Sequence, residues 1–245
     1  MSENIVEKTS LENLGNGCGI YVNKNHTFGT DAVLLADFAA PKKSDVAVDL
    51  GTGCGIIPML WARDNAVLAS CGLEIQSEAV NLAKRSAAEF GGENAPEFFC
   101  GDIKNPFDVL KKGQYTLVTC NPPYKANNAG IKSRQSASKI ARHELLCNIE
   151  DVINTASKLL KFGGRLALCQ RPERLSEILS LMAQYKIEPK VLRLVCKSEG
   201  KEPWLVLVAG RKGGGCGLRI MPNLNMYDAS GNLTDEVKKI YKYQG

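Results

Sequence analysis

Several features that would place this chain in a membrane or a secretory compartment are absent from its 245 residues. No apolar run approaches the roughly 18 residues that a transmembrane helix needs. The first ten residues, MSENIVEKTS, are polar and lack the apolar centre of a secretion signal. We therefore expect a cytoplasmic protein with no membrane partner.

Closely spaced cysteine pairs are also absent, although cysteine itself is abundant. The nine cysteines are odd in number, and no two of them form a CxxC motif. Neither a disulfide framework nor a zinc site is therefore predicted, and we expect no metal. Five cysteines lie in or beside apolar runs and are predicted to be small buried hydrophobic residues: Cys54, Cys71, Cys100, Cys120 and Cys169.

The composition is that of an ordinary globular protein, with 44% hydrophobic and 23% charged residues. It excludes a disordered or fibrous chain. The sequence has no internal repeat and no long linker, so a single domain over residues 1–245 is predicted. The net charge of +5 permits a nucleic-acid partner without requiring one.

Short apolar runs alternate with stretches of helical periodicity, which is typical of a doubly wound parallel sheet. Two late runs, joined by a short polar turn, leave no room for a crossover helix and are predicted to pair as an antiparallel hairpin. Gly163 and Gly164 are expected to end the helix before the fifth strand. The pattern predicts an α/β fold with a seven-stranded, mostly parallel sheet and a C-terminal antiparallel hairpin. Strands are predicted at 45–50, 69–74, 97–100, 115–120, 165–170, 191–196 and 204–209, and helices at 31–40, 77–90, 152–160, 175–182 and 234–241.

A glycine-rich loop follows the first predicted strand, in the sequence Asp49-Leu50-Gly51-Thr52-Gly53-Cys54-Gly55. Glycines at such a position let the backbone approach a ligand closely and direct a helix N-terminus toward it. The pattern is GxGxG, and it differs from the GxGxxG of dinucleotide enzymes. A tight turn without a ligand is the alternative interpretation.

The next three strands also end in polar residues. Glu74 ends the second strand, Asp102 follows the third, and Asn121-Pro122-Pro123-Tyr124 follows the fourth. In open α/β sheets, ligands bind at the carboxyl ends of the strands. Each polar residue alone is explained by a solvated end or a turn, but four in succession favour a ligand site.

Together, these four motifs resemble those of class I methyltransferases that use S-adenosyl-L-methionine (SAM) and act on amino groups. The resemblance spans residues 28–210 and implies a Rossmann-like class I methyltransferase fold. It implies that Asp49 and the loop from Gly51 to Gly55 hold the methionine part of SAM, Glu74 its ribose and Asp102 its adenine. The cofactor contacts implied here are Asp49, Gly51, Thr52, Gly53, Gly55, Glu74, Ile75, Asp102, Ile103 and Asn121.

The NPPY segment has a direct chemical interpretation. The lone pair of an adenine amino group or a glutamine amide is delocalised and weakly nucleophilic. Two acceptors aimed at its hydrogens, the Asn121 side-chain carbonyl and the Pro122 main-chain carbonyl, favour the transition state because charge develops there on nitrogen. Tyr124 offers a flat face on which a planar substrate stacks. We predict that Asn121, Pro122 and Tyr124 are catalytic; an ordinary turn is the alternative.

Residues 25–35, NHTFGTDAVLL, resemble a segment of the bacterial tRNA (adenine-N6)-methyltransferases that lies against the cofactor. Those enzymes modify the adenosine beside the anticodon of a valine tRNA. The resemblance makes Phe28 and Thr30 candidate cofactor contacts, although Phe28 is equally well interpreted as core. It divides the chain into a cofactor-covering segment (1–44), a core (45–210) and a tail (211–245).

A run of positive charge follows NPPY. Residues 125–143 contain no acidic residue, and a basic segment beside a stacking tyrosine would meet phosphates that flank a flipped base. A solvated surface is the alternative. The sequence thus predicts N6-methylation of an adenine in RNA, most specifically tRNA, by a monomer or weak dimer. The candidate RNA contacts are Lys125, Lys132, Arg134, Lys139 and Arg142.

Two other functions stay open at this stage. Glutamine N5-methyltransferases of release factors also use NPPY, but they carry a helical domain before the core, whereas here the first predicted strand begins at residue 45. That family also tends to have an aliphatic residue where this chain has Lys125. A non-catalytic module that binds SAM and RNA is the second alternative, against which the intact Asn121 and acidic strand ends argue.

Overall fold

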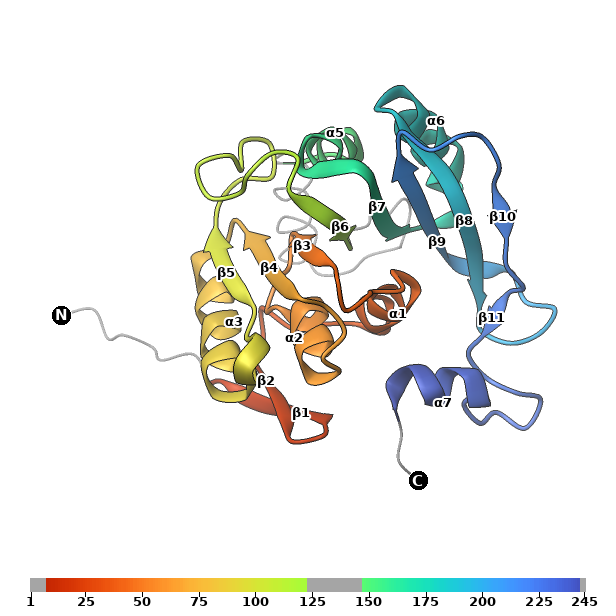
Figure 1. Cartoon of the computed structure of the whole chain (residues 1–245). Coiled ribbons are helices and arrows are strands. Elements are labelled where there is room, and N and C mark those ends of the chain that lie inside the picture. Colours follow the sequence, from red (N-terminus) through yellow and green to blue (C-terminus); the bar gives the residue numbers. More distant parts are fainter. Residues whose placement is uncertain (1–7, 123–146, 243–245) are drawn as a thin grey trace, which may run out of the picture.

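A mixed β-sheet runs through the protein and carries helices on both faces (Figure 1). The computed structural model describes residues 8–122 and 147–242. Within them, the sheet has nine strands in the order β10-β8-β9-β7-β6-β3-β4-β5, with β11 also paired to β8. Neighbours from β7 to β5 are parallel, and β9 is antiparallel to both β7 and β8. The bounds are β3 (Val46–Leu50), β4 (Ala69–Glu74), β5 (Glu97–Cys100), β6 (Tyr115–Cys120), β7 (Leu160–Gln170), β8 (Ile187–Cys196), β9 (Pro203–Lys212), β10 (Arg219–Ile220) and β11 (Leu224–Asn225).

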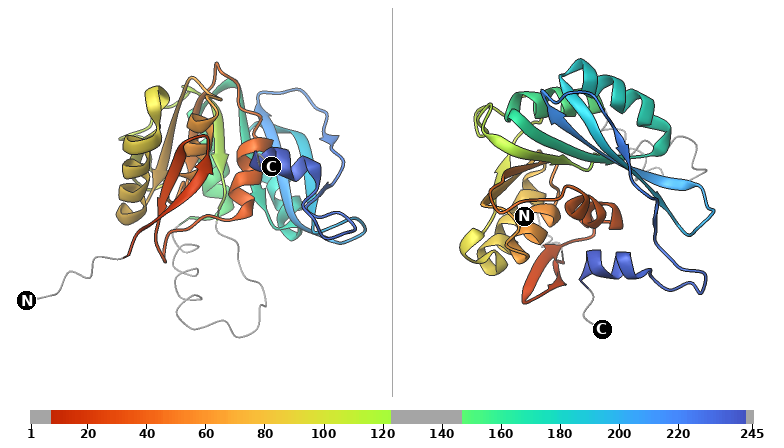
Figure 2. Two further views of the ribbon diagram at one scale, coloured as in Figure 1. Left: turned by 90° about the horizontal axis from the view of Figure 1, so that it is seen from below. Right: turned by 45° about the vertical axis from the view of Figure 1, so that its right-hand side comes forward.

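The seven predicted strands are all present, and so is the antiparallel C-terminal hairpin, formed by β8 and β9. The two-residue strands β10 and β11 were not predicted, and they extend the sheet beyond β8. A separate hairpin of β1 (Ser10–Gly15) and β2 (Cys18–Val22) was also not predicted. Figure 2 shows this hairpin beside α3, which β2 contacts.

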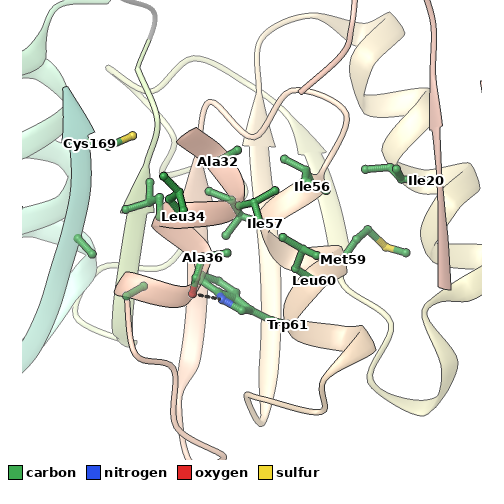
Figure 3. Close-up of a cluster of buried hydrophobic side chains, with 14 of the residues drawn as sticks. Ile20, Ala32, Leu34, Ala36, Ile56, Ile57, Met59, Leu60, Trp61 and Cys169 are labelled. Atoms are coloured by element: carbon green, nitrogen blue, oxygen red, sulfur yellow. Dashed lines mark hydrogen bonds between the residues drawn. The ribbon is translucent and has the colours of Figure 1, made fainter. Parts of the chain in front are cut away.

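The two faces of the sheet are covered by different helices, because side chains alternate along each strand. Ala47 and Leu117 point into the cluster that contains α1, α2 and α3, whereas Val48 and Val118 point into the cluster under α5 and α6. In the first cluster, the Trp61 indole donates to the Ala36 carbonyl at 3.1 Å and ties α2 to α1 (Figure 3). The helices are α1 (Thr30–Phe38), α2 (Ile56–Arg63), α3 (Ser77–Phe90), α5 (Ile149–Leu159), α6 (Leu175–Gln184) and α7 (Asp235–Tyr241), with 3-10 turns η1 (Gly92–Asn94) and η2 (Pro172–Arg174).

The boundary between α5 and β7 differs from the expected one. The helix ends at Leu159, and the next residue is already extended. Gly163 and Gly164 therefore lie inside β7, where the pairing with β6 is irregular between Tyr115 and Leu117. Gly163 has a φ of +79°, and a Cβ on Gly164 would come within 3.0 Å of backbone oxygens. The two glycines serve this irregularity and do not end the helix.

Four of the five cysteines expected in the core are buried, and Cys100 is exposed. Cys100 is the last residue of β5, which is the edge strand of the sheet, so one side of it has no neighbouring strand. Among the described residues, no helix combines the length and apolar character that crossing a membrane requires.

Candidate functional site

The carboxyl ends of β3, β4 and β6 lie side by side, because Leu50 pairs with both Leu73 and Cys120. Two cavities open at this edge of the sheet and share Gly51, Asn121 and Pro122. The loop cavity, of about 430 Å³, is lined by the glycine loop and by a preceding segment that contributes Thr27, Phe28, Gly29, Asp31 and Ala32. The β4 cavity, of about 250 Å³, is lined by the ends of β4 and β6, the turn after β5 and the start of α5.

The glycine loop needs its glycines for two reasons. Gly51, Gly53 and Gly55 all have positive φ, a region that side chains other than glycine rarely adopt. A Cβ on Gly55 would also lie 2.6 Å from the Phe98 ring, whereas one on Gly53 would meet open space. The loop is thus packed on one side and open toward the cavity on the other.

Thr52 brings an unsatisfied polar atom to the loop cavity. Its N–H donates to the Leu73 carbonyl at 3.0 Å. Its hydroxyl oxygen, however, is buried without a hydrogen-bond partner among the described residues. A buried hydroxyl in that condition is costly unless a ligand or water completes it.

Glu74 braces the glycine loop from the end of β4. Its Oε2 accepts the Gly53 N–H at 3.0 Å, and its Oε1 accepts the Gln76 N–H at 3.0 Å. The residue is 6% exposed. Oε1 also accepts from Gln76 Nε2 at 3.4 Å. Because a carboxylate oxygen can accept two hydrogen bonds, Oε2 retains capacity for a ligand in the β4 cavity.

Asp49 is the most buried acid of the site, with 2% of its surface exposed. Its Oδ1 accepts the Thr119 hydroxyl at 2.7 Å. Burial, with a smaller contribution from the charge of Glu74, raises the pKa of Asp49 to about 7, against the hydroxyls of Thr119 and Thr52, which lower it. Asp49 is therefore poised to take up or release a proton when a charged ligand enters.

Asp102 lies in the turn after β5 and lines the β4 cavity. Its Oδ1 accepts the Lys104 N–H at 2.9 Å. The neighbouring Ile103 carbonyl accepts the Thr155 hydroxyl at 2.8 Å, which fixes the turn on α5. Ile75 and Ile103 line the same cavity and give it apolar walls on which a planar group can lie.

Asn121 and Pro122 stand where the two cavities meet. The Cys169 thiol donates to Asn121 Oδ1 at an S···O distance of 3.0 Å. Cys169 is buried in β7, one residue past the Cys120–Leu168 pair of neighbouring strands. The side-chain carbonyl of Asn121 is thus held at a defined place. Outside the described residues lie Tyr124 and the five candidate RNA contacts, Lys125, Lys132, Arg134, Lys139 and Arg142.

The segment before β3 lines the loop cavity, but not at every position that was predicted to contact the cofactor. Phe28 lines the loop cavity and also packs on the first core cluster, a position compatible with both interpretations of it. Thr30 begins α1 but is not among the residues that line either cavity; its neighbours Gly29 and Asp31 are. Asn23 and His26 both contact Glu78 of α3, at 2.6 and 3.3 Å, and anchor the segment.

Several lining residues escaped the sequence reasoning. Gln76 and Cys120 directly adjoin predicted residues, and a wider window around each motif would have included them. Cys147 and Val152 come from a different part of the chain and reach the β4 cavity through the start of α5. That helix begins with a capping box, in which Asn148 accepts the Asp151 N–H and Asp151 accepts the Asn148 N–H.

The charge of the site is of one sign. Asp31 and Asp49 line the loop cavity, Glu74 and Asp102 line the β4 cavity, and no Lys, Arg or His lines either one within the described residues. Such a lining attracts a positively charged ligand. The long double cavity suits a molecule with an ammonium-bearing part at one end and a planar, hydroxyl-bearing part at the other.

Comparisons with known proteins show what the chain is similar to. The family described as "Methyltransferase small domain" matches residues 13–185. A relative from Porphyromonas gingivalis strain W83, called tRNA1(Val) (adenine(37)-N6)-methyltransferase, is 30% identical over 193 residues, which cover 76% of this chain and 72% of that protein. A protein of the same name from Aeromonas hydrophila is 27% identical over 210 residues, covering 84% and 85% of the two chains.

Solved structures show a similar fold. A predicted O-methyltransferase from Agrobacterium tumefaciens superposes with a TM-score of 0.70 at 24% identity, covering 87% of this chain and 96% of that one. A putative methyltransferase from Bacillus halodurans has a TM-score of 0.55 at 15% identity, covering 76% and 100%. At these identities the likeness concerns the fold alone.

Proposed function

Because this chain belongs to the methyltransferase small-domain family, we propose that it transfers a methyl group from SAM to N6 of an adenine in tRNA, beside the anticodon. The observation that carries the proposal is the position of Asn121, the first residue of NPPY, at the junction of the two cavities. The names of the similar proteins from P. gingivalis and A. hydrophila support the choice of tRNA adenine.

The residues of the double cavity fit SAM. The molecule carries an ammonium and a sulfonium, which suit a lining with four carboxylates and no described cation. Asp49, the unpaired Thr52 hydroxyl and the glycine loop would hold its methionine part. Glu74 would accept from the ribose, while Asp102, Ile75 and Ile103 would hold the adenine. Bound there, SAM supplies a methyl group already activated on sulfur.

The protein's part in the transfer is to orient the acceptor nitrogen. Asn121 Oδ1, held by Cys169, and the Pro122 main-chain carbonyl accept the two amino hydrogens of the target adenine. Charge that develops on nitrogen strengthens both hydrogen bonds, so the transition state gains more than the ground state. We propose that Tyr124 stacks on the flipped base and that the cations from Lys125 to Arg142 contact its flanking phosphates.

The test is methyl transfer from labelled SAM to total RNA from cells that lack this gene, followed by digestion to nucleosides. We expect label in N6-methyladenosine. A release-factor protein is tested in parallel. Label in that protein instead of RNA would mean that the substrate is a protein glutamine. SAM binding without label in either would favour a non-catalytic module.

A matched pair of variants makes this assay sharper. Asn121→Ala removes the proposed acceptor, whereas Asn81→Ala removes an exposed asparagine on α3, away from the cavities. Label should disappear from the RNA in the first variant and persist in the second.

A further inference from the structure

A third cavity, of about 480 Å³, lies outside the proposed site and is larger than either of its two cavities. It is bounded by α1, by one face of β7, β9 and β8, and by the C-terminal segment that includes β10 and α7. Figure 2 shows α1 and α7 on the same side of these strands. Ala167 and Leu207 of the sheet, together with Leu34 of α1, give the cavity apolar walls.

The rim of this basic cavity carries five cations, Arg165, Lys190, Arg193, Arg211 and Arg219. Register brings them together: Arg165 pairs with Arg211 across β7 and β9, and Arg219 pairs with Val191 across β10 and β8. The cavity therefore has the opposite charge from the proposed methyl-transfer site.

Only two of these cations are neutralised by a carboxylate among the described residues. Arg165 binds Asp45 at 2.5 Å, and Arg193 binds Glu236 at 2.7 Å. Lys190 donates to the carbonyls of Gly215 and Gly217, and Arg211 to that of Gly163.

Carbonyl acceptors of this kind hold a side chain in place but do not cancel its charge. Arg219 makes no described hydrogen bond or ion pair, and Asp37 is the one other acid that lines the cavity. Three cations against Asp37 leave a net charge of about +2, which is favourable for an anion.

The basic cavity and the loop cavity are connected by α1. Asp31 and Ala32, near the start of this helix, line the loop cavity, and Asp37 and Phe38, at its end, line the basic cavity. Nine helical residues span about 13 Å. The two cavities therefore border opposite ends of one short helix, a separation that a few backbone phosphates of a nucleic acid can span.

We propose that the basic cavity binds backbone phosphates of the substrate RNA a few nucleotides from the target adenine. The inference rests on the proposed function, because that function supplies the RNA. Arg211 and Lys190, which backbone carbonyls hold in place, are pre-organised for phosphate oxygens. RNA that contains the stem next to the target loop would use this contact, and a short loop fragment would not reach it.

The experiment compares Arg219→Ala combined with Lys190→Ala, the charge-conserving Arg219→Lys, and Lys84→Ala as a control on the exposed face of α3. Binding of tRNA is measured at several salt concentrations, and methyl transfer is measured with tRNA and with a loop fragment. For the double variant we expect tRNA binding on the order of tenfold weaker and a salt slope smaller by about 2. SAM affinity and activity on the fragment should stay unchanged, and the other two variants should match wild type.

Equal tRNA affinity and salt slope in the double variant and wild type would overturn the cavity proposal while leaving the methylation proposal standing. Failure of wild-type enzyme to label RNA would instead overturn the methylation proposal. Inorganic phosphate is added alone as a third arm. If it raises the melting temperature of wild type but not of the double variant, while tRNA binding is equal in both, the cavity binds small anions and not RNA.

Discussion

The two ends of α1 border cavities of opposite charge. At its start, Asp31 joins Asp49 in a lining without described cations, and at its end Arg165 and Arg211 dominate the rim. The difference follows from the strands beneath. Parallel strands place their carboxyl ends and acidic turns on one edge, whereas the antiparallel pair β7 and β9 aligns the start of one strand with the end of the other. One helix thus separates a place for a cationic small molecule from a place for a polyanion.

The largest effect should come from Asn121→Ala, which tests the acidic cavities at the place where the methyl group is proposed to be transferred. Loss of a transition-state acceptor should reduce kcat on the order of a hundredfold or more and leave SAM affinity nearly unchanged. Steady-state kinetics and calorimetry separate the two quantities. An equal loss in both would make Asn121 a structural residue.

Glu74→Ala should mainly weaken SAM binding. The substitution removes the acceptor proposed for the ribose and also releases the Gly53 N–H. A hydrogen bond to a charged group contributes about 1.5 to 3 kcal/mol, so its loss should raise the Kd for SAM roughly ten- to a hundredfold. Calorimetry should show Glu74→Gln in between and Glu173→Ala, an exposed control, at the wild-type value. Unchanged binding by Glu74→Ala would refute the ribose assignment.

A pH dependence should follow from Asp49, whose pKa burial raises to about 7. The folded protein without ligand holds this proton more tightly than the unfolded chain, so its stability should fall as pH rises from about 4 to 7. A cationic ligand prefers the carboxylate, so SAM affinity should rise over the upper part of that range, by up to about tenfold per pH unit below 7. Asp49→Asn should flatten both curves, in melting and in calorimetry. Parallel curves for Asp49→Asn and wild type would exclude Asp49 as the titrating group.

Most residues of the acidic cavities could be predicted from the sequence, whereas few of those around the basic cavity could. Buried parallel strands are continuous apolar runs that stop at Gly, Asp or Asn, so β3 to β6 and their polar ends could be located from pattern alone. The basic cavity gathers its cations from residues 165 to 219, and their placement depends on the register of β7, β8 and β9. Counting charged residues gives the net charge of the chain but not where the charges lie in the fold.

Local sequence pattern also failed to predict the structure at positions where strand pairing determines the backbone conformation. Gly163-Gly164 has the signature of a helix end, yet its conformation serves the irregular pairing of β7 with β6. The β1–β2 hairpin escaped because five of the six residues of β1 are exposed, so the strand shows little apolar pattern. Cys169 was correctly expected to be buried, but its contact with Asn121 arises from neighbouring strand ends that no motif joins.

That contact gives the smallest expected effect. If the thiol keeps Asn121 Oδ1 aimed at the acceptor nitrogen, Cys169→Ala should lower kcat by roughly three- to tenfold, the size of one modest hydrogen bond. Cys169→Ser keeps a donor at the same place and should restore most of that loss. SAM affinity should be unchanged in both, because the thiol lies outside the lining of either cavity. If Cys169 has only a structural role, both variants should have a lower melting temperature and the same kcat. Measuring kcat together with thermal unfolding therefore decides whether Cys169 positions the acceptor.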